Sequence, residues 1–261
     1  MLSDLGSNAL WNEPLVGALF GEFYLNHHAD RRTGAFIMAP SRRDAWLPAV
    51  RGMVLRGAAK RFPNLPREGY LIVKEPNGYL GAPLLSAAMP ESRLVFVLRD
   101  PRDVVASGLD AQRAGGWTAD LQVWKGVEKP VQLADTDPEA FVRDVAELYL
   151  KGIQQVERAY LAHAGPKAMV KYEALRASPK QTMLELCSKL EFKVQDDELT
   201  KAVEGRAWEK IPPEQKGDRQ FFRKATPGAW VEDLSVDQAR IVEDVTAPVL
   251  TRFYAEVHDV G

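Results

Sequence analysis

The sequence predicts an α/β fold in which a parallel sheet is flanked by helices. Three short apolar runs, each bounded by glycine, proline or charged residues, have the composition of buried strands. Helical patterns separate these runs. Strands that alternate with helices form parallel sheets, whose ligands bind at the carboxyl ends of the strands. The expected strands are Tyr70–Lys74, Arg93–Leu98 and Lys167–Lys171.

Helices are expected around these strands, and three of them begin with a start signal. Asp137-Pro138-Glu139 offers an N-cap, a first-turn proline and an acid near the positive end of the helix dipole. Ser178-Pro179 is a similar start, and Ser235 with Gln238 forms a capping box. The predicted helices are Asp44–Phe62, Ala82–Ala88, Pro101–Ala114, Pro138–Ala164, Pro179–Leu190, Asp196–Gly205 and Val236–Val257.

Two long segments are predicted to be irregular. Gly115–Asp137 contains a glycine pair and a proline, and Gly205–Gly228 contains Pro212-Pro213 and further glycines. Loops of this length in a compact domain are usually lids, binding segments or disordered stretches.

Composition is that of an ordinary globular protein, with 46% hydrophobic and 27% charged residues in 261. The net charge of −2 gives no overall basic field, so nucleic acid is not an expected partner. Between Arg31 and Arg67, however, the sequence contains nine basic residues and a single acidic residue, Asp44. That region is either a solvated helix face or a funnel for an anionic substrate.

Cysteine content and apolar patterning bear on the compartment. The single cysteine, Cys187, excludes an intramolecular disulfide framework and fits a reducing compartment. Its amphipathic surroundings predict a buried apolar role rather than a reactive thiol. No window approaches the 18 or so apolar residues of a membrane span, and the first residues lack a signal peptide's pattern. We therefore expect a soluble, cytoplasmic protein without a membrane span.

The segment most informative about function is Arg99–Ser107, entered directly from the apolar run Leu94–Leu98. Pro101 suits a first helical turn and Asp100 suits an N-cap, so the segment is typical of a strand that feeds a helix. A guanidinium at the strand end and a hydroxyl two turns down the helix form an anion pocket, and phosphate is the expected ligand. The alternative is an ordinary strand–helix junction with surface arginines.

This segment resembles the 3′-phosphate-binding motif of the sulfotransferases, which use 3′-phosphoadenosine 5′-phosphosulfate (PAPS) as sulfuryl donor. The resemblance extends from about Trp11 to Trp230. It implies a single domain over 1–261 with the sulfotransferase version of the P-loop-containing nucleotide hydrolase architecture. It also implies that Arg99 and Ser107 bind the 3′-phosphate of the donor.

Phe222–Trp230 is similar to the family's C-terminal R-K-G-x-x-G-x-W segment, which implies that Arg223 and Lys224 also hold the 3′-phosphate. Ala225 replaces the first glycine of that segment. Its N–H can still donate, provided that the backbone does not need a positive φ there.

Three further segments resemble parts of the donor site. Tyr172, at the end of the third strand, matches a tyrosine that lies near the adenine. Lys74 is a candidate for stabilising charge on the transferring group, but the catalytic histidine of cytosolic family members has no counterpart beside it. A carboxylate is then the remaining general base. Glu13, in a segment similar to an E-P motif of the family, is our preferred base, with Glu75 as the alternative.

The family's 5′-phosphosulfate loop, which resembles P-K/R-S-G-S/T-T/S-W-L, has no counterpart in this chain. Met1–Asn8 instead matches the helix that follows that loop, with Leu2 and Leu5 on its core face and Gly6 as its C-cap. The resemblance therefore implies a domain that lacks its first strand and this loop at the N-terminus, and the activity of such a chain is open.

The sequence thus predicts transfer of a sulfuryl group from PAPS to a hydroxyl or amine of a small-molecule or carbohydrate acceptor. No metal is implied, since there is no His/Cys cluster and cationic side chains can supply the charge. We expect the acceptor to meet Gly115–Asp137 and the basic Arg31–Arg67 region. The alternatives are an inactive nucleotide- or partner-binding module and a P-loop phosphotransferase, although a G-x-x-x-x-G-K-S/T loop is missing.

Overall fold

All three predicted strands are present in the computed structural model, which describes residues 1–17, 19–21, 35–76, 78–117 and 133–255. They are β2 (Leu71–Lys74), β3 (Leu94–Leu98) and β4 (Lys167–Lys171). A fourth strand, β1 (Ala9–Asn12), was not expected. Hydrogen bonds join the strands in two pairs, β1 with β2 and β3 with β4.

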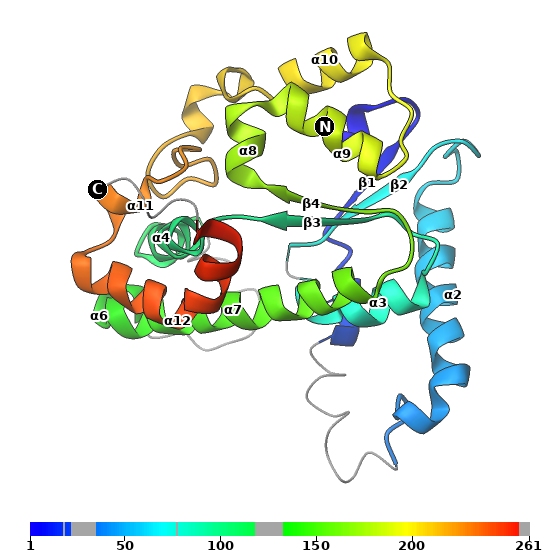
Figure 1. Ribbon diagram of the computed structural model, residues 1–261, viewed down its shortest axis with the longest axis horizontal. Helices are drawn as coiled ribbons and strands as arrows, with labels where there is room; N and C mark the ends of the chain where they lie inside the picture. The colour runs from blue at the N-terminus through cyan, green and yellow to red at the C-terminus, as the bar shows by residue number, and fades with distance from the viewer. Residues whose placement is uncertain (18, 22–34, 77, 118–132, 256–261) are drawn as a thin grey trace. The chain divides into compact units, whose positions relative to one another are not determined.

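Strands β1 and β2 are parallel, with Ala9 opposite Leu71 and Asn12 opposite Lys74 (Figure 1). Both strands therefore end at the same edge of their sheet. The side chains and chain segments that follow Asn12 and Lys74 are brought together there.

The start of the chain differs from the predicted helix. Only Leu2–Asp4 is helical, as the short 3-10 turn η1, and the chain then leads into β1. Leu5 is buried as expected, and Gly6 has a positive φ of 52°. The expected helix over Met1–Asn8 is wrong, because this stretch forms a short 3-10 turn and then leads into strand β1.

The chain divides into two compact units. Unit 1 comprises Met1–Phe96, Gly152–Val170 and Ser178–Gly205, and unit 2 comprises Val97–Lys151, Lys171–Ala177 and Arg206–Gly261. Strands β3 and β4 and the long helix α7 (Pro138–Ala162) contribute residues to both units.

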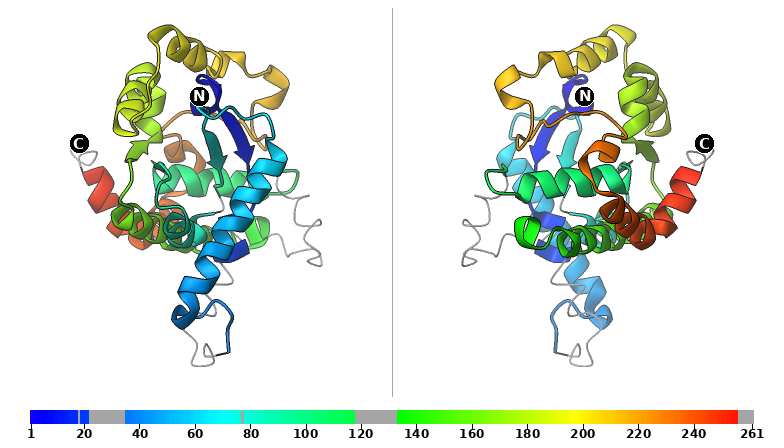
Figure 2. Two further views of the ribbon diagram at one scale, coloured as in Figure 1. Left: turned by 90° about the vertical axis from the view of Figure 1, so that its right-hand side faces the viewer. Right: turned by 90° about the vertical axis from the view of Figure 1, so that its left-hand side faces the viewer.

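Unit 1 contains α2 (Arg43–Arg61), α3 (Ala82–Ala88), α9 (Pro179–Lys189) and α10 (Asp196–Glu204), with 3-10 turns at Pro40–Arg42 and Tyr79–Gly81. Pro48 lies inside α2, which remains one continuous helix (Figure 2). Trp46 and Val50 of α2 pack with Leu84 and Ala88 of α3 in a buried apolar cluster. Cys187 is buried, as predicted.

Unit 2 is mainly helical. Its core joins Val105 and Leu109 of helix α4 to Val142 of α7 and Val242 of helix α12. The described helices of this unit outside α7 are α4 (Pro101–Gln112), α6 (Leu133–Thr136), α8 (Tyr172–Ala177), α11 (Trp230–Asp233) and α12 (Val236–Tyr254), with 3-10 turns at Trp208–Lys210 and Pro213–Gln215.

Most of the predicted helix starts are confirmed. Asp100 caps α4, Asp137 accepts a hydrogen bond from the Ala140 N–H before α7, and Ser235 and Gln238 form the capping box of α12. Ser178 precedes α9 as expected, but its side chain makes no capping hydrogen bond. Within the described ranges, no helix combines the length and apolarity needed to cross a bilayer.

Candidate functional site

The β3–α4 junction is built as the sequence predicts. Asp100 accepts a hydrogen bond from the Arg102 N–H at 2.8 Å, and Pro101 occupies the first helical position. Arg99 consequently stands at the carboxyl end of β3, and Ser107 lies half-buried two turns into α4.

Arg99 and Tyr172 are brought together in unit 2. The guanidinium carbon of Arg99 lies 4.8 Å from the centre of the Tyr172 ring, and Tyr172 begins α8 directly after β4. Arg99 Nε is buried without a hydrogen-bond partner, and no ion pair of Arg99 is found among the described residues. A cation held on a ring but not neutralised by a carboxylate is suited to receive an anion.

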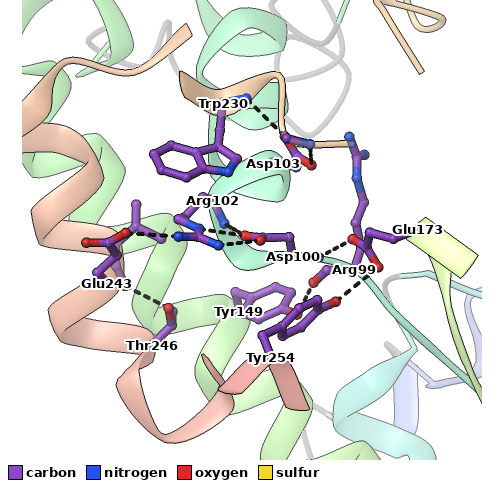
Figure 3. Close-up of polar contacts among 12 residues, drawn as sticks. Arg99, Asp100, Arg102, Asp103, Tyr149, Glu173, Trp230, Glu243, Thr246 and Tyr254 are labelled. Carbon is purple, nitrogen blue, oxygen red and sulfur yellow. Dashed lines mark hydrogen bonds and ion pairs between the residues drawn. The ribbon is translucent and has the colours of Figure 1, made fainter. Parts of the chain in front are cut away.

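Three buried or half-buried side chains fix this junction (Figure 3). Glu173 Oε1 accepts a hydrogen bond from the Asp100 N–H at 2.8 Å, and its Oε2 accepts one from the Tyr254 hydroxyl at 3.2 Å. The Tyr149 hydroxyl donates to the Arg99 carbonyl at 2.5 Å. Burial, reinforced by the nearby Asp100 and Glu173 carboxylates, raises the pKa of both tyrosines. Both hydroxyls therefore stay protonated donors near neutral pH.

Arg102 is a structural cation rather than a surface arginine. Its guanidinium pairs with Asp100 at 2.7 Å and with Glu243 of α12 at 3.0 Å, and it lies 4.3 Å from the centre of the Trp230 ring (Figure 3). Burial alone would lower the pKa of Arg102, but the hydrogen bonds and charges of the two carboxylates raise it. It remains charged and joins α4 to α12.

The two predicted clamp residues of the 223–230 segment are ion-paired. Arg223 Nη1 lies 2.6 Å from Asp233 Oδ2, and Lys224 Nζ lies 2.9 Å from Asp233 Oδ1 and 3.1 Å from Glu232 Oε2. Burial alone would raise the pKa of the Asp233 carboxyl, but the hydrogen bonds from Lys224 and Arg223 outweigh it and lower that pKa. The sequence did not predict the roles of Glu232 and Asp233, because both acids follow the last residue of the family segment, Trp230.

Ala225 adopts the conformation that a glycine would favour. Its φ is 53°, in the left-handed region, so the condition under which alanine replaces glycine without strain is not met. The Ala225 carbonyl accepts a hydrogen bond from Arg176 Nε at 3.1 Å, which ties the segment to α8.

Asp103 was also missed by sequence reasoning. Its carboxylate is 1% exposed and accepts two backbone hydrogen bonds, from Gly228 N–H at 2.8 Å and Trp230 N–H at 3.1 Å (Figure 3). In the sequence it is an acid in the first turn of a helix, which is expected at the positive end of any helix dipole. That signal could not reveal its distant partners.

In unit 1, Glu13 and Lys74 meet at the shared edge of β1 and β2. Lys74 Nζ lies 3.2 Å from Glu13 Oε1, and the Glu13 N–H donates to the Lys74 carbonyl at 2.8 Å. Both side chains are partly exposed, at 39% for Glu13 and 50% for Lys74. A carboxylate and an ammonium in contact can take a proton and stabilise negative charge at one place.

Glu75 is engaged differently from Glu13. Its Oε1 accepts a hydrogen bond from the Gly17 N–H at 2.7 Å, and the carboxyl group also lies close to Gly78. This carboxylate orders the backbone after Pro14, whereas the Glu13 carboxylate contacts Lys74.

The histidines offer no alternative base among the described residues. His163 is buried and its ring contacts Ser86 Oγ at 2.9 Å and the Ser92 carbonyl at 2.7 Å, so both nitrogens serve the packing of unit 1. His27, His28 and His258 lie outside the described residues.

The regions expected to meet the acceptor are described only in part. Residues 118–132 of the predicted Gly115–Asp137 segment lie outside the described ranges, as do Arg31 and Arg32 of the basic region. Trp117, at the described edge of that segment, packs edge to face against Phe221 with ring centres 5.0 Å apart. In the basic region, Arg51 is paired with Glu91 at 2.6 Å.

The fold and the cluster in unit 2 define an α/β protein with a cationic side chain, Arg99, at the end of strand β3. A family model described as the sulfotransferase domain matches residues 80–254, which is more than half of the chain. The chain belongs to the sulfotransferase family, whose members are transferases. The β3–α4 junction and the 223–230 segment both lie within the matched residues.

A solved structure has the same fold. It is the crystal structure of mouse sulfotransferase SULT7A1 complexed with PAP, to which this chain is 13% identical with a TM-score of 0.51. The match covers 96% of this chain and 88% of the mouse chain. A search of curated protein sequences gives no significant match.

Proposed function

We propose that this protein transfers a sulfuryl group from PAPS to a hydroxyl or amine acceptor. The observation that carries the proposal is the Arg99 guanidinium, held on the Tyr172 ring at the end of β3 with a buried Nε that lacks a partner. Membership of the sulfotransferase family and the PAP named with the mouse structure support the choice of donor.

We assign the binding roles from the family resemblance, and the charge and position of the residues support them. Arg99, Ser107, Arg223 and Lys224 would hold the 3′-phosphate, and Tyr172 would lie against the adenine. Arg223 and Lys224 together bear two positive charges opposite the Asp233 and Glu232 carboxylates, so a phosphate dianion would share these cations with both acids. Arg99 would provide the remaining, unshared cation.

The reaction requires a base and a cation. The acceptor oxygen or nitrogen would attack the sulfur as the bond from sulfur to the 5′-phosphate oxygen breaks, and adenosine 3′,5′-bisphosphate would leave with the bonding pair. Glu13 would take the acceptor's proton, and Lys74 would stabilise charge on the sulfuryl oxygens. The Glu13–Lys74 contact at 3.2 Å supports giving these two roles to this pair.

We further propose that both units belong to one catalytic domain and that no metal takes part. The acceptor is a small molecule or a carbohydrate. The single cysteine, buried in α9, supports a reducing compartment such as the cytoplasm.

Calorimetric titration with adenosine 3′,5′-bisphosphate tests the proposal. The wild-type protein should bind without added metal, and Arg99→Ala should lose binding by about 100-fold, since a charge-assisted contact is removed from a partly buried site. Arg240→Ala is the charge-matched control, because Arg240 is an exposed residue of α12 paired only loosely with Asp237 at 3.7 Å. Unchanged affinity in Arg99→Ala would contradict the assignment.

Transfer of labelled sulfate then separates the candidate functions. Turnover with PAPS supports the transferase. Tight bisphosphate binding without transfer to any tested acceptor would favour the nucleotide-binding module, and magnesium-dependent reaction with ATP would favour the phosphotransferase.

A further inference from the structure

The segment that carries Arg223 and Lys224 has little regular structure of its own. Between Gly205 and Gly228 the described chain has two 3-10 turns and one isolated bridge, between Lys216 and Phe222, and its backbone includes positive φ values at Gly217, Arg219, Ala225 and Gly228. A loop of this kind does not hold two long basic side chains in place through its own hydrogen bonds. Something outside the loop must fix it.

Asp103 supplies the attachment at one end of the loop. Its two carboxylate oxygens accept the N–H groups of Gly228 and Trp230, which lie 125 and 127 residues further along the chain. Gly228 has a φ of 82°, a conformation that turns the chain so that both N–H groups can point at one carboxylate. The loop is thus bound to the first turn of α4, the helix that also carries Ser107.

Burial shows that these bonds are required by Asp103 as well as by the loop. A carboxylate that is 1% exposed is costly unless its oxygens are hydrogen-bonded. No cation is paired with Asp103 among the described residues, so the two N–H groups and the positive end of the α4 dipole must stabilise the charge.

The ring of Trp230 strengthens the same attachment. It packs against the core cluster of α4, α7 and α12 and lies under the Arg102 guanidinium. The Ala225 carbonyl accepts a hydrogen bond from Arg176 of α8. The chain is therefore held at Ala225, directly after Lys224, and again at Gly228 and Trp230.

We propose that Asp103 is a positioning residue for the donor's 3′-phosphate. It sets the place of Arg223 and Lys224 relative to Ser107 through the Gly228 and Trp230 amides, and it does not touch the ligand itself. This inference rests on the proposed donor site.

The test compares two nucleotides that differ only in the 3′-phosphate. Asp103→Asn keeps the shape of the side chain but presents an amide N–H₂ to one of the two backbone donors, so one hydrogen bond is lost. We expect the affinity for adenosine 3′,5′-bisphosphate to fall about tenfold, while the affinity for adenosine 5′-monophosphate stays unchanged. Asp135→Asn is the matched control, because Asp135 also accepts a backbone N–H in unit 2, that of Ala114, a residue that does not belong to this loop.

Amide hydrogen exchange provides a readout that needs no ligand. In the wild-type protein the Gly228 and Trp230 amides should exchange much more slowly than amides of the exposed loop, and Asp103→Asn should speed both. The proposal is overturned if the variant leaves exchange and the affinity ratio unchanged, or if both nucleotides lose affinity equally. Should Asp103→Asn not fold, fast wild-type exchange at both amides overturns the proposal by itself.

The outcomes also separate this inference from the proposed function. If the wild-type protein binds both nucleotides alike, the 3′-phosphate site is wrong. If the wild type prefers the bisphosphate and Asp103→Asn retains that preference, only the role of Asp103 is wrong.

Discussion

The Arg99 guanidinium lies over the Tyr172 ring, with 4.8 Å between the guanidinium carbon and the ring centre. The two residues follow different strands, β3 and β4, and are 73 positions apart in the sequence. The contact orients the guanidinium without neutralising its charge, as the proposed binding of an anionic ligand requires.

Replacing the Tyr172 ring tests whether its aromatic face orients the Arg99 guanidinium for ligand binding. Tyr172→Phe keeps the aromatic face and should retain most of the affinity for adenosine 3′,5′-bisphosphate. Tyr172→Leu keeps only apolar bulk and should weaken binding roughly fivefold, as expected for loss of a partly exposed cation–π contact. Calorimetry on both variants decides the matter, and equal affinities of the two variants for the bisphosphate would show that the ring face has no role.

Removing the proposed base should separate binding from turnover. In Glu13→Gln, sulfuryl transfer should fall by at least about 100-fold because the amide cannot accept the acceptor's proton. The affinity for adenosine 3′,5′-bisphosphate should not change. Transfer of labelled sulfate and calorimetry give the two quantities.

Glu75→Gln is the control for that experiment, since a glutamine oxygen can still accept the Gly17 N–H. We expect its turnover to remain close to that of the wild type. If Glu75→Gln instead loses turnover while Glu13→Gln keeps it, Glu75 is the base.

The strained backbone at Ala225 predicts a stabilising substitution. Ala225→Gly should raise the free energy of unfolding by about 0.5–1 kcal/mol, because glycine adopts a φ of 53° without the Cβ penalty. Ala229→Gly is the matched control, since Ala229 has a φ of −65° and should gain nothing. Denaturant unfolding measures both, and a destabilised Ala225→Gly protein would contradict the strain.

Asp233 should make stability depend on pH in the acid range. Its pKa is lowered in the folded protein, below the ordinary value of 3.8, so its ionised form stabilises the fold above that value. This contribution is lost as the pH falls through the lowered pKa. The difference in unfolding free energy between the wild type and Asp233→Asn should therefore be largest above about pH 5 and shrink towards pH 2–3. Parallel denaturant titrations at several pH values test this, and a difference that grows on acidification would rule it out.

Local patterns explain why so much of unit 2 could be predicted. The apolar run before Arg99, the Asp100 cap and Pro101 act over a few residues, and the structure confirms that junction. The Ser235–Gln238 capping box is equally local and is also present. Strand β1 was missed because four residues with one exposed apolar side chain carry little periodicity.

The sequence by itself therefore determined the strand–helix order, the family resemblance and the basic residues that we propose for the phosphate site. The tertiary structure alone decided which groups the acidic side chains contact. Asp103 bonds to amides more than a hundred positions away, Asp233 pairs with Arg223 and Lys224, and Glu13 meets Lys74 across two strands. Contacts between distant parts of a chain depend on the packing of whole elements, which no short stretch of sequence specifies.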